Sequence, residues 1–207
     1  MFIISTYIKM NNKIKQHILD LLTNQLQDFE LMDGGQQRTV GDLIEHKVIE
    51  ILFNSKGEII TETKKSTGKK STEDVTLISN GVSYYIDPKT HNINSDFSMP
   101  NLTAIEKLKK IIHTPNCEMM YILVNYEIVN KMVMIKGFDI FFLWEIDCSI
   151  LGIGALGRGQ LQLKDANKEL IFTDKGKEGW FEDFKEIVQE FFQKQLVKIN
   201  KQILDWK

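Results

Sequence analysis

The chain has 207 residues, a formal net charge of −2 and a sequence pI near 6.1. With 43% hydrophobic and 26% charged residues it matches an ordinary folded domain, which excludes extensive disorder and a disulfide-rich scaffold. Near-neutral charge gives no electrostatic sign of a nucleic-acid-binding protein. No apolar run approaches the roughly 20 residues that span a bilayer, and no signal peptide is recognisable, so we expect a cytoplasmic protein with no membrane partner.

The first third of the chain has helical spacing of its apolar residues. This spacing predicts helices over residues 12–30 and about 39–52, separated by Asp33-Gly34-Gly35. We expect this N-terminal region, about residues 1–53, to contribute to dimerisation. Residues 55–71 are predicted to form a polar loop, with a short strand at 58–62, and its basic side chains are Lys64, Lys65, Lys69 and Lys70.

Two β-type runs, residues 75–79 and 82–86, flank Asn80-Gly81, which is a strong hairpin signal. The rest of the chain predicts a helix from Pro100 to Ile112, strands at 119–126, 132–135, 138–143 and 160–163, a glycine-rich loop at 152–159, and one long or two joined helices at 178–206. The apolar stripe of that last segment is predicted to be core or dimer interface. Helices on both sides of a central run of strands indicate one mixed α/β domain spanning residues 1–207.

The two-residue hairpin turn fixes which residues face each other. If Ser79 faces Val82, the register places Asp74 directly opposite Asp87. Lys89 lies two residues after Asp87 and therefore points to the same face.

This arrangement predicts a metal-assisted chemistry. Like charges directly opposite each other on a sheet are unfavourable, and a divalent cation is the simplest way to neutralise them. Mg²⁺ commonly uses one or two carboxylates with phosphate oxygens and water, and a nearby lysine can orient a water or stabilise phosphate charge. The set therefore suits phosphodiester hydrolysis. The alternative is a solvated hairpin edge, because the acid-x-Lys triplet alone is weak and occurs five times in this chain.

The same residues carry a resemblance to a known family. Asp74-Val75 followed by the segment from Tyr85 to Ile93 resembles the active-site strand pair of the PD-(D/E)xK nuclease superfamily, and most closely the type II restriction endonucleases of the HincII/EcoRV blunt-cutting branch. Pro100-Asn101-Leu102, Gln160-Leu161-Gln162 and residues 176–180 continue the likeness. It implies a restriction-endonuclease-like α/β fold, a central mixed β-sheet flanked by helices.

The resemblance also implies roles for individual residues. Asp74 and Asp87 would bind Mg²⁺, and Lys89 would be the catalytic lysine. Pro88 would offer its carbonyl to the metal, and because proline lacks an N–H, this strand end is predicted at an edge or bulge. Glu45 is either an additional acidic metal ligand or an exposed helix carboxylate.

DNA-reading residues are predicted at the end of the glycine-rich loop at residues 152–159 and in the strand that follows it. Arginine to guanine and glutamine to adenine are standard major-groove contacts, and the candidates here are Arg158, Gly159, Gln160 and Gln162. The alternative is a glycine-rich turn with a surface arginine. His91 and Asn92 are further DNA-binding candidates, and the four lysines of residues 64–70 either grip phosphates or form a solvated loop.

As a whole, the resemblance implies a homodimeric type II restriction endonuclease. It would cut double-stranded DNA at a short palindromic site, leave 5′-phosphates, and belong to a system with a cognate DNA methyltransferase. The alternatives are a structure-specific repair or recombination nuclease of the same superfamily and a non-catalytic DNA-binding module. We also expect a basic cleft near the aspartate pair despite the net charge of −2.

Overall fold

The protein is described by a computed structural model that covers residues 2–31, 37–66, 73–95, 101–154, 159–164 and 169–206. Its largest element is a six-stranded sheet in the order β1-β7-β6-β4-β3-β2. Only the central pair β4–β6 is parallel, so the sheet is mixed. The strands are β1 (Phe29–Glu30), β2 (Glu62–Lys65), β3 (Val75–Ser79), β4 (Val82–Asn92), β6 (Cys117–Val129) and β7 (Met132–Phe142).

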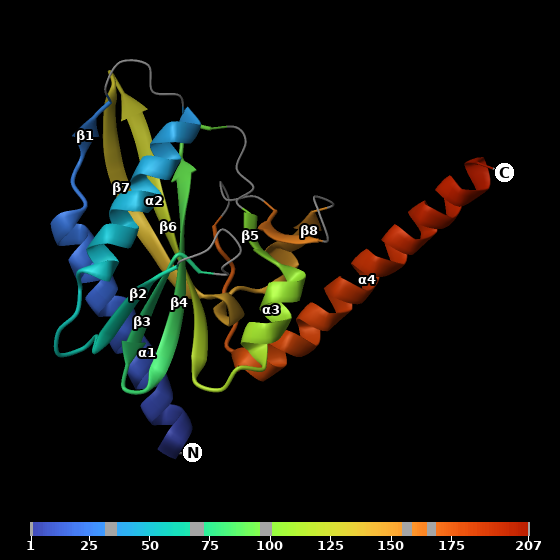
Figure 1. Ribbon diagram of the computed structural model, residues 1–207, viewed down its shortest axis with the longest axis horizontal. Coiled ribbons are helices and arrows are strands. Elements are labelled where there is room, and N and C mark those ends of the chain that lie inside the picture. Colours follow the sequence, from blue (N-terminus) through green and yellow to red (C-terminus); the bar gives the residue numbers. More distant parts are fainter. Residues whose placement is uncertain are drawn as a thin grey trace.

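A small antiparallel sheet, four α-helices and two short 3-10 helices, Leu143–Glu145 and Cys148–Ile150, complete the described part of the chain. The small sheet has the order β5 (Asn101–Ala104), β9 (Gln160–Leu163), β8 (Leu151–Gly154). The helices are α1 (Phe2–Gln25), α2 (Gln37–Phe53), α3 (Ile105–Ile112) and α4 (Gly176–Asp205). Helices α1 and α2 lie along one side of the large sheet, α3 and the small sheet lie on the other, and α4 extends away from the body (Figure 1).

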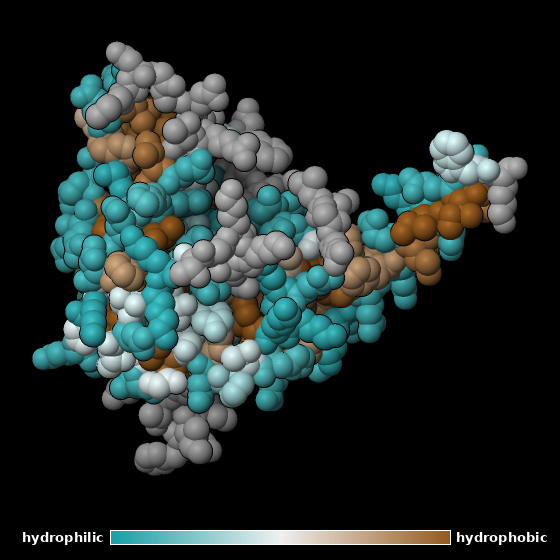
Figure 2. Space-filling model, viewed as in Figure 1, coloured by the Kyte–Doolittle hydropathy of each residue, from teal (hydrophilic) through white to brown (hydrophobic). Residues whose placement is uncertain are grey.

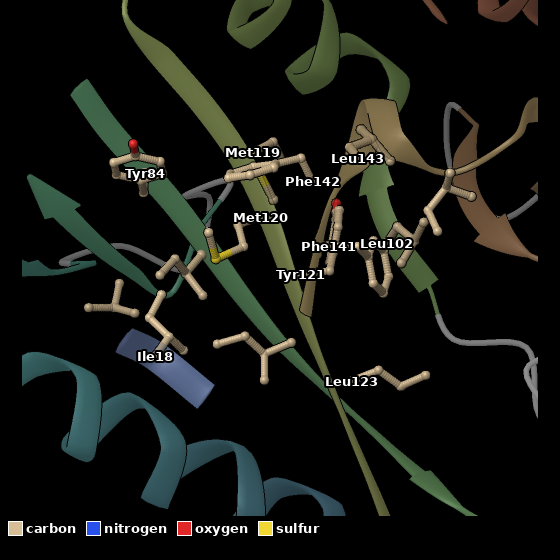
Figure 3. Packing of buried hydrophobic residues seen from close by; sticks show 14 of the residues in the cluster. Ile18, Tyr84, Leu102, Met119, Met120, Tyr121, Leu123, Phe141, Phe142 and Leu143 are labelled. Atoms are coloured by element: carbon tan, nitrogen blue, oxygen red, sulfur yellow. The ribbon is translucent and has the colours of Figure 1, made fainter. Parts of the chain in front are cut away.

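The two faces of the large sheet bury separate hydrophobic layers. On one face the stripe Ile14, Ile18 and Leu22 of α1 is buried, and the Tyr84 hydroxyl donates to Asn11 Oδ1 at 3.1 Å. On the other face Tyr121 packs against Phe141 with ring centroids 5.9 Å apart; Figure 3 shows these two rings beside Leu102 and away from Ile18. None of the described helices is both long and apolar enough to cross a bilayer.

The predicted hairpin is confirmed in its register. Val75 pairs with Ile86, Leu77 with Tyr84, and Ser79 with Val82. Asn80 and Gly81 both have positive φ, at 50° and 77°, as this two-residue turn requires. The single long helix α4 also confirms the predicted C-terminal helical segment.

Several predicted elements were wrong in type or extent. The segment predicted as a helix from Pro100 begins with strand β5, because residues 101–104 pair with β9 before α3 starts at Ile105. The predicted strands 132–135 and 138–143 are one strand, β7, in which Gly137 lies at a register shift rather than a turn. Strand β8 occupies part of the predicted loop, and β2 lies at 62–65 instead of 58–62. The first helix ends at Gln25, and residues 29–30 join the large sheet.

Candidate active site

Strands β3 and β4 bring the predicted aspartate pair together. Asp74 directly precedes β3, where its N–H donates to the Ile86 carbonyl and its own carbonyl accepts from the Ser66 N–H, both at 3.0 Å. These bonds fix its main chain opposite Asp87. The Asp74 carboxyl lies close enough to Asp87 to raise the pKa of Asp87.

Lys89 lies on the same face as Asp87, as the strand alternation predicts. Its Nζ contacts Asp87 Oδ1 at 2.6 Å, and the two side chains are 22% and 8% exposed. The ammonium is therefore held by a largely buried ion pair and is not free to sample the solvent.

Pro88 lies where the missing N–H costs no ladder bond. Residues two apart on a strand turn their backbone groups to the same side, and Ile86 turns its carbonyl toward Asp74. The backbone groups of Pro88 therefore point to the β3 side of β4, where the pairing with β3 ends at Ile86. Strand β6 pairs with the opposite edge of β4. The local sheet edge agrees with the sequence prediction, and the Pro88 carbonyl is directed toward the aspartate side.

Helix α2 adds a third carboxylate, Glu45. Gly41 lets the helix approach β4 closely, since a Cβ at Gly41 would lie 2.7 Å from Thr90 Oγ1. One turn later, Glu45 lies near the Thr90 side chain, which lowers the pKa of Glu45, and interacts electrostatically with Lys89 and Asp74. Of the two sequence interpretations, the exposed helix carboxylate is wrong, because Glu45 is partly buried within the cluster.

Burial controls the ionisation of this cluster, defined as Glu45, Asp74, Asp87 and Lys89. The pKa of Asp87 is raised to about 7, mainly by burial. Lys89 opposes this rise, and the Asp74 carboxyl contributes to it. Burial also raises the pKa of Glu45 to about 7, with Lys89 opposing it. For Lys89, burial acts to lower the pKa, but Asp87, Glu45 and Asp74 together raise it above its ordinary value. Three carboxylates thus share one ammonium in a poorly solvated place, which is typical of functional sites.

The donor chemistry fits a hard divalent cation. Carboxylate oxygens of Asp74 and Asp87 with the Pro88 carbonyl form an oxygen set of the kind Mg²⁺ uses, with water completing it. Within the described ranges no three His, Cys, Asp or Glu side chains converge tightly enough to form a metal site by side chains alone. A cation here would therefore depend on the main-chain carbonyl, water and substrate oxygens.

Three polar groups beside the cluster were not predicted. Tyr121 pairs with Asp87 across the parallel β4–β6 ladder, and its buried hydroxyl has no hydrogen-bond partner among the described residues. Further along the same face, Asn125 Nδ2 donates to Asp139 Oδ2 at 2.7 Å, while Asn125 Oδ1 lies 3.0 Å from His91 Nδ1. Because that amide oxygen only accepts, the contact selects the Nδ1–H form of His91. The sequence gives no local signal that these residues lie beside the cluster. Strands β4 and β6 are distant in sequence and are not joined by a tight turn that would fix their register.

Most of the described DNA-binding candidates already have partners within the chain. His91 is 7% exposed, and Asn92 Oδ1 accepts from the Asn94 N–H at 3.0 Å. Gly159 is buried, and Gln162 donates to Asn101 Oδ1 at 2.5 Å. Gln160 is partly exposed on β9. Arg158, Lys69 and Lys70 lie outside the described residues.

The lysines at the edge of the large sheet lie close in register to the aspartates. Lys65 pairs with Val75, the residue after Asp74. Its Nζ lies 4.8 Å from the centroid of Phe53, and Lys64 contacts Glu62 at 3.1 Å. The basic cleft remains a prediction, because two of its four lysines and Arg158 fall outside the described part.

Comparisons with known proteins support the fold. No family model and no curated protein sequence matches the chain. Among solved structures, the chain is similar to the NlaIV restriction endonuclease, with 15% sequence identity over 86% of this chain and 89% of that chain and a TM-score of 0.54. The chain therefore has a restriction-endonuclease-like fold, and the predicted fold class is confirmed.

Proposed function

We propose that this chain is a Mg²⁺-dependent type II restriction endonuclease that cuts double-stranded DNA at a short palindromic site. The observation that carries the proposal is the convergence of Glu45, Asp74, Asp87 and Lys89 at the end of one hairpin within a restriction-endonuclease-like fold. The similar NlaIV protein is named as a restriction endonuclease, which supports the same function here.

In this proposal, Asp74, Asp87 and the Pro88 carbonyl hold the cation, with Glu45 as an additional ligand. When bound, Mg²⁺ supplies Lewis-acid stabilisation of phosphate charge and lowers the pKa of a coordinated water. Lys89 is held in place by Asp87, so its ammonium can orient the attacking water and stabilise charge on the scissile phosphate. Water oxygen bonds to phosphorus, the P–O3′ bond breaks, and the departing oxygen takes a proton, which leaves a 3′-hydroxyl and a 5′-phosphate.

The finer parts of the proposal rest on the sequence resemblance. They are membership of the HincII/EcoRV branch, a homodimer whose two-fold symmetry matches a palindromic site, and a cognate DNA methyltransferase in the same system. The second candidate function, a structure-specific nuclease, keeps the same cluster and chemistry but recognises the shape of DNA.

Digestion of a long mapped DNA in Mg²⁺, followed by sequencing of the ends, tests the proposal. Discrete fragments that share one short sequence and carry 5′-phosphates are expected. Cleavage confined to branched or damaged DNA would replace the proposal with the structure-specific nuclease. Absence of Mg²⁺-dependent cleavage on every substrate would favour a non-catalytic DNA-binding module.

A further inference from the structure

Among the described residues, the side chains of helix α4 that pack against the body all lie in about its first half. Trp180 and Phe184 are buried and stacked with centroids 4.8 Å apart, and the Trp180 indole N–H donates to the Ile146 carbonyl at 2.8 Å. The last side chain of α4 packed against the core is Phe191. Beyond it the helix continues to Asp205 and projects from the molecule (Figure 1).

The projecting half carries an apolar stripe that the body does not cover. We call this stripe the α4 seam, and each of its side chains is at least half exposed: Phe192, Leu196, Ile199, Ile203 and Trp206. Figure 2 shows the hydrophobic colour running along the projecting helix. Val197 and Leu204, which are also exposed, widen the stripe on one side. An amphipathic helix gains most of its stability by packing such a face. Among the described residues, none covers the seam.

The spacing of the seam specifies what kind of partner fits. Its members follow one another at intervals of four, three, four and three residues. This is a repeat of 3.5 residues, the a and d positions of a heptad, which keeps a narrow apolar row facing another helix. The first half of α4, which packs against the body, does not continue this repeat. The corresponding positions there are occupied by Gln189 and Lys185.

The positions that flank the seam favour an identical helix. In coiled coils the flanking e and g residues choose the partner, and like charges there repel. Between Phe192 and Trp206 all four flanking residues are uncharged amides, namely Gln193, Gln195, Asn200 and Gln202. The charged side chains between these two ends lie outside the flanking positions, at Lys194, Lys198, Lys201 and Asp205, and the one charged flanking residue, Lys207, follows the last seam residue. Two copies can therefore approach in either direction without charge repulsion, whereas a partner selected by charge would find no complement.

We infer that the α4 seam pairs with the α4 seam of a second copy and forms a short two-helix coiled coil. The inference extends the proposed dimeric nuclease by naming the surface through which two copies meet. The expected contribution of residues 1–53 to dimerisation stays a separate prediction, and Ile14, Ile18 and Leu22 of α1 are buried inside their own chain.

Analytical ultracentrifugation of the full chain, without DNA or metal, tests the inference. The parent, with a chain mass of 24.0 kDa, should sediment as a dimer at micromolar concentration. The double variant Leu196→Glu and Ile203→Glu should raise the dimer dissociation constant at least ~100-fold, because it places unpaired charges in the seam. The matched variant Lys201→Glu, on the outer face of the same segment, should change it by less than about 3-fold.

Circular dichroism and the melting temperature establish that the seam variant keeps its fold, since both substituted side chains are exposed in the single chain. A parent that is monomeric at ~50 μM would have a dimer dissociation constant well above that concentration, which is an association weaker than about −6 kcal/mol, and would overturn the inference. So would a seam variant that stays dimeric. Because neither measurement uses DNA or Mg²⁺, their failure leaves the cleavage chemistry proposed for the cluster intact and removes only the dimer, and a failure of cleavage leaves the coiled coil intact.

Discussion

Replacing Asp87 by asparagine should stabilise the folded chain while it abolishes cleavage. The Asp87 carboxyl is buried, and burial raises its pKa from 3.8 to about 7. At pH 8 the folded state must hold the carboxylate in an environment that favours the neutral acid. Asparagine has nearly the same shape and carries no charge, so the substitution removes this cost.

The pKa shift sets the size of the effect. A rise from 3.8 to about 7 corresponds to at most about 4 kcal/mol of destabilisation at pH 8. The shift already includes the attraction of Lys89. Because an asparagine amide reproduces the contacts of the neutral acid only in part, we expect a net gain of about 2 kcal/mol, or roughly 4–8 °C in melting temperature for a domain of this length. The sign follows from linkage. Between pH 4 and 7 the Asp87 carboxyl of the unfolded chain loses the proton that the folded chain keeps, so this group lowers the stability of the parent as the pH rises. The variant lacks this contribution, although Glu45 and Glu118 still make theirs.

Thermal melting at several pH values between 5 and 8, without divalent ions, measures the difference. Glu118→Gln is the matched control, because Glu118 is also buried, its Oε2 has no hydrogen-bond partner among the described residues, and burial raises its pKa to about 7. It lies outside the cluster, so this variant should gain stability at pH 8 and keep its cleavage activity. If the advantage of Asp87→Asn over the parent does not grow from pH 5 to pH 8, the raised pKa of Asp87 is wrong.

Three further outcomes follow from the geometry. Cleavage should accelerate as the pH rises from about 6 to 8, because Glu45 and Asp87 must lose their protons to bind a cation. A higher Mg²⁺ concentration should move the midpoint of this pH–rate profile to lower pH, and a flat profile would contradict the reasoning. Thr90→Val removes the hydroxyl group that lowers the pKa of Glu45, so that midpoint should move upward with little change in melting temperature. Gly159→Ala should cost about 1–3 kcal/mol in urea unfolding, since Gly159 has φ of +97° and the new Cβ would lie 2.6 Å from Ile105 Cδ1; an unchanged urea midpoint would show that the packing there is looser.

The part of the site that lies within one hairpin was predictable from sequence. The Asn80-Gly81 turn fixes the register, and the register alone places Asp74 opposite Asp87 with Lys89 on the same face. Local rules suffice because the turn and both strands are contiguous in the chain.

The remaining features depend on contacts between distant segments. The parallel pairing of Asp87 with Tyr121 joins strands with no shared turn, so no sequence signal sets it. Residues 101–104 form a strand because β9 pairs with them, whatever their local preference. Glu45 joins the cluster only through the close approach of α2 at Gly41, which spacing along the helix does not predict.

The central claim is that the cluster of Glu45, Asp74, Asp87 and Lys89 performs Mg²⁺-dependent phosphodiester cleavage. Its most direct test is the rate of plasmid cleavage in Mg²⁺ by the parent, by Lys89→Ala and by Lys136→Ala, a matched variant whose lysine makes a surface ion pair with Glu127. We expect Lys89→Ala to cut about 1,000-fold more slowly, and Lys136→Ala to cut at the rate of the parent. Equal rates for the parent and Lys89→Ala would contradict the assignment.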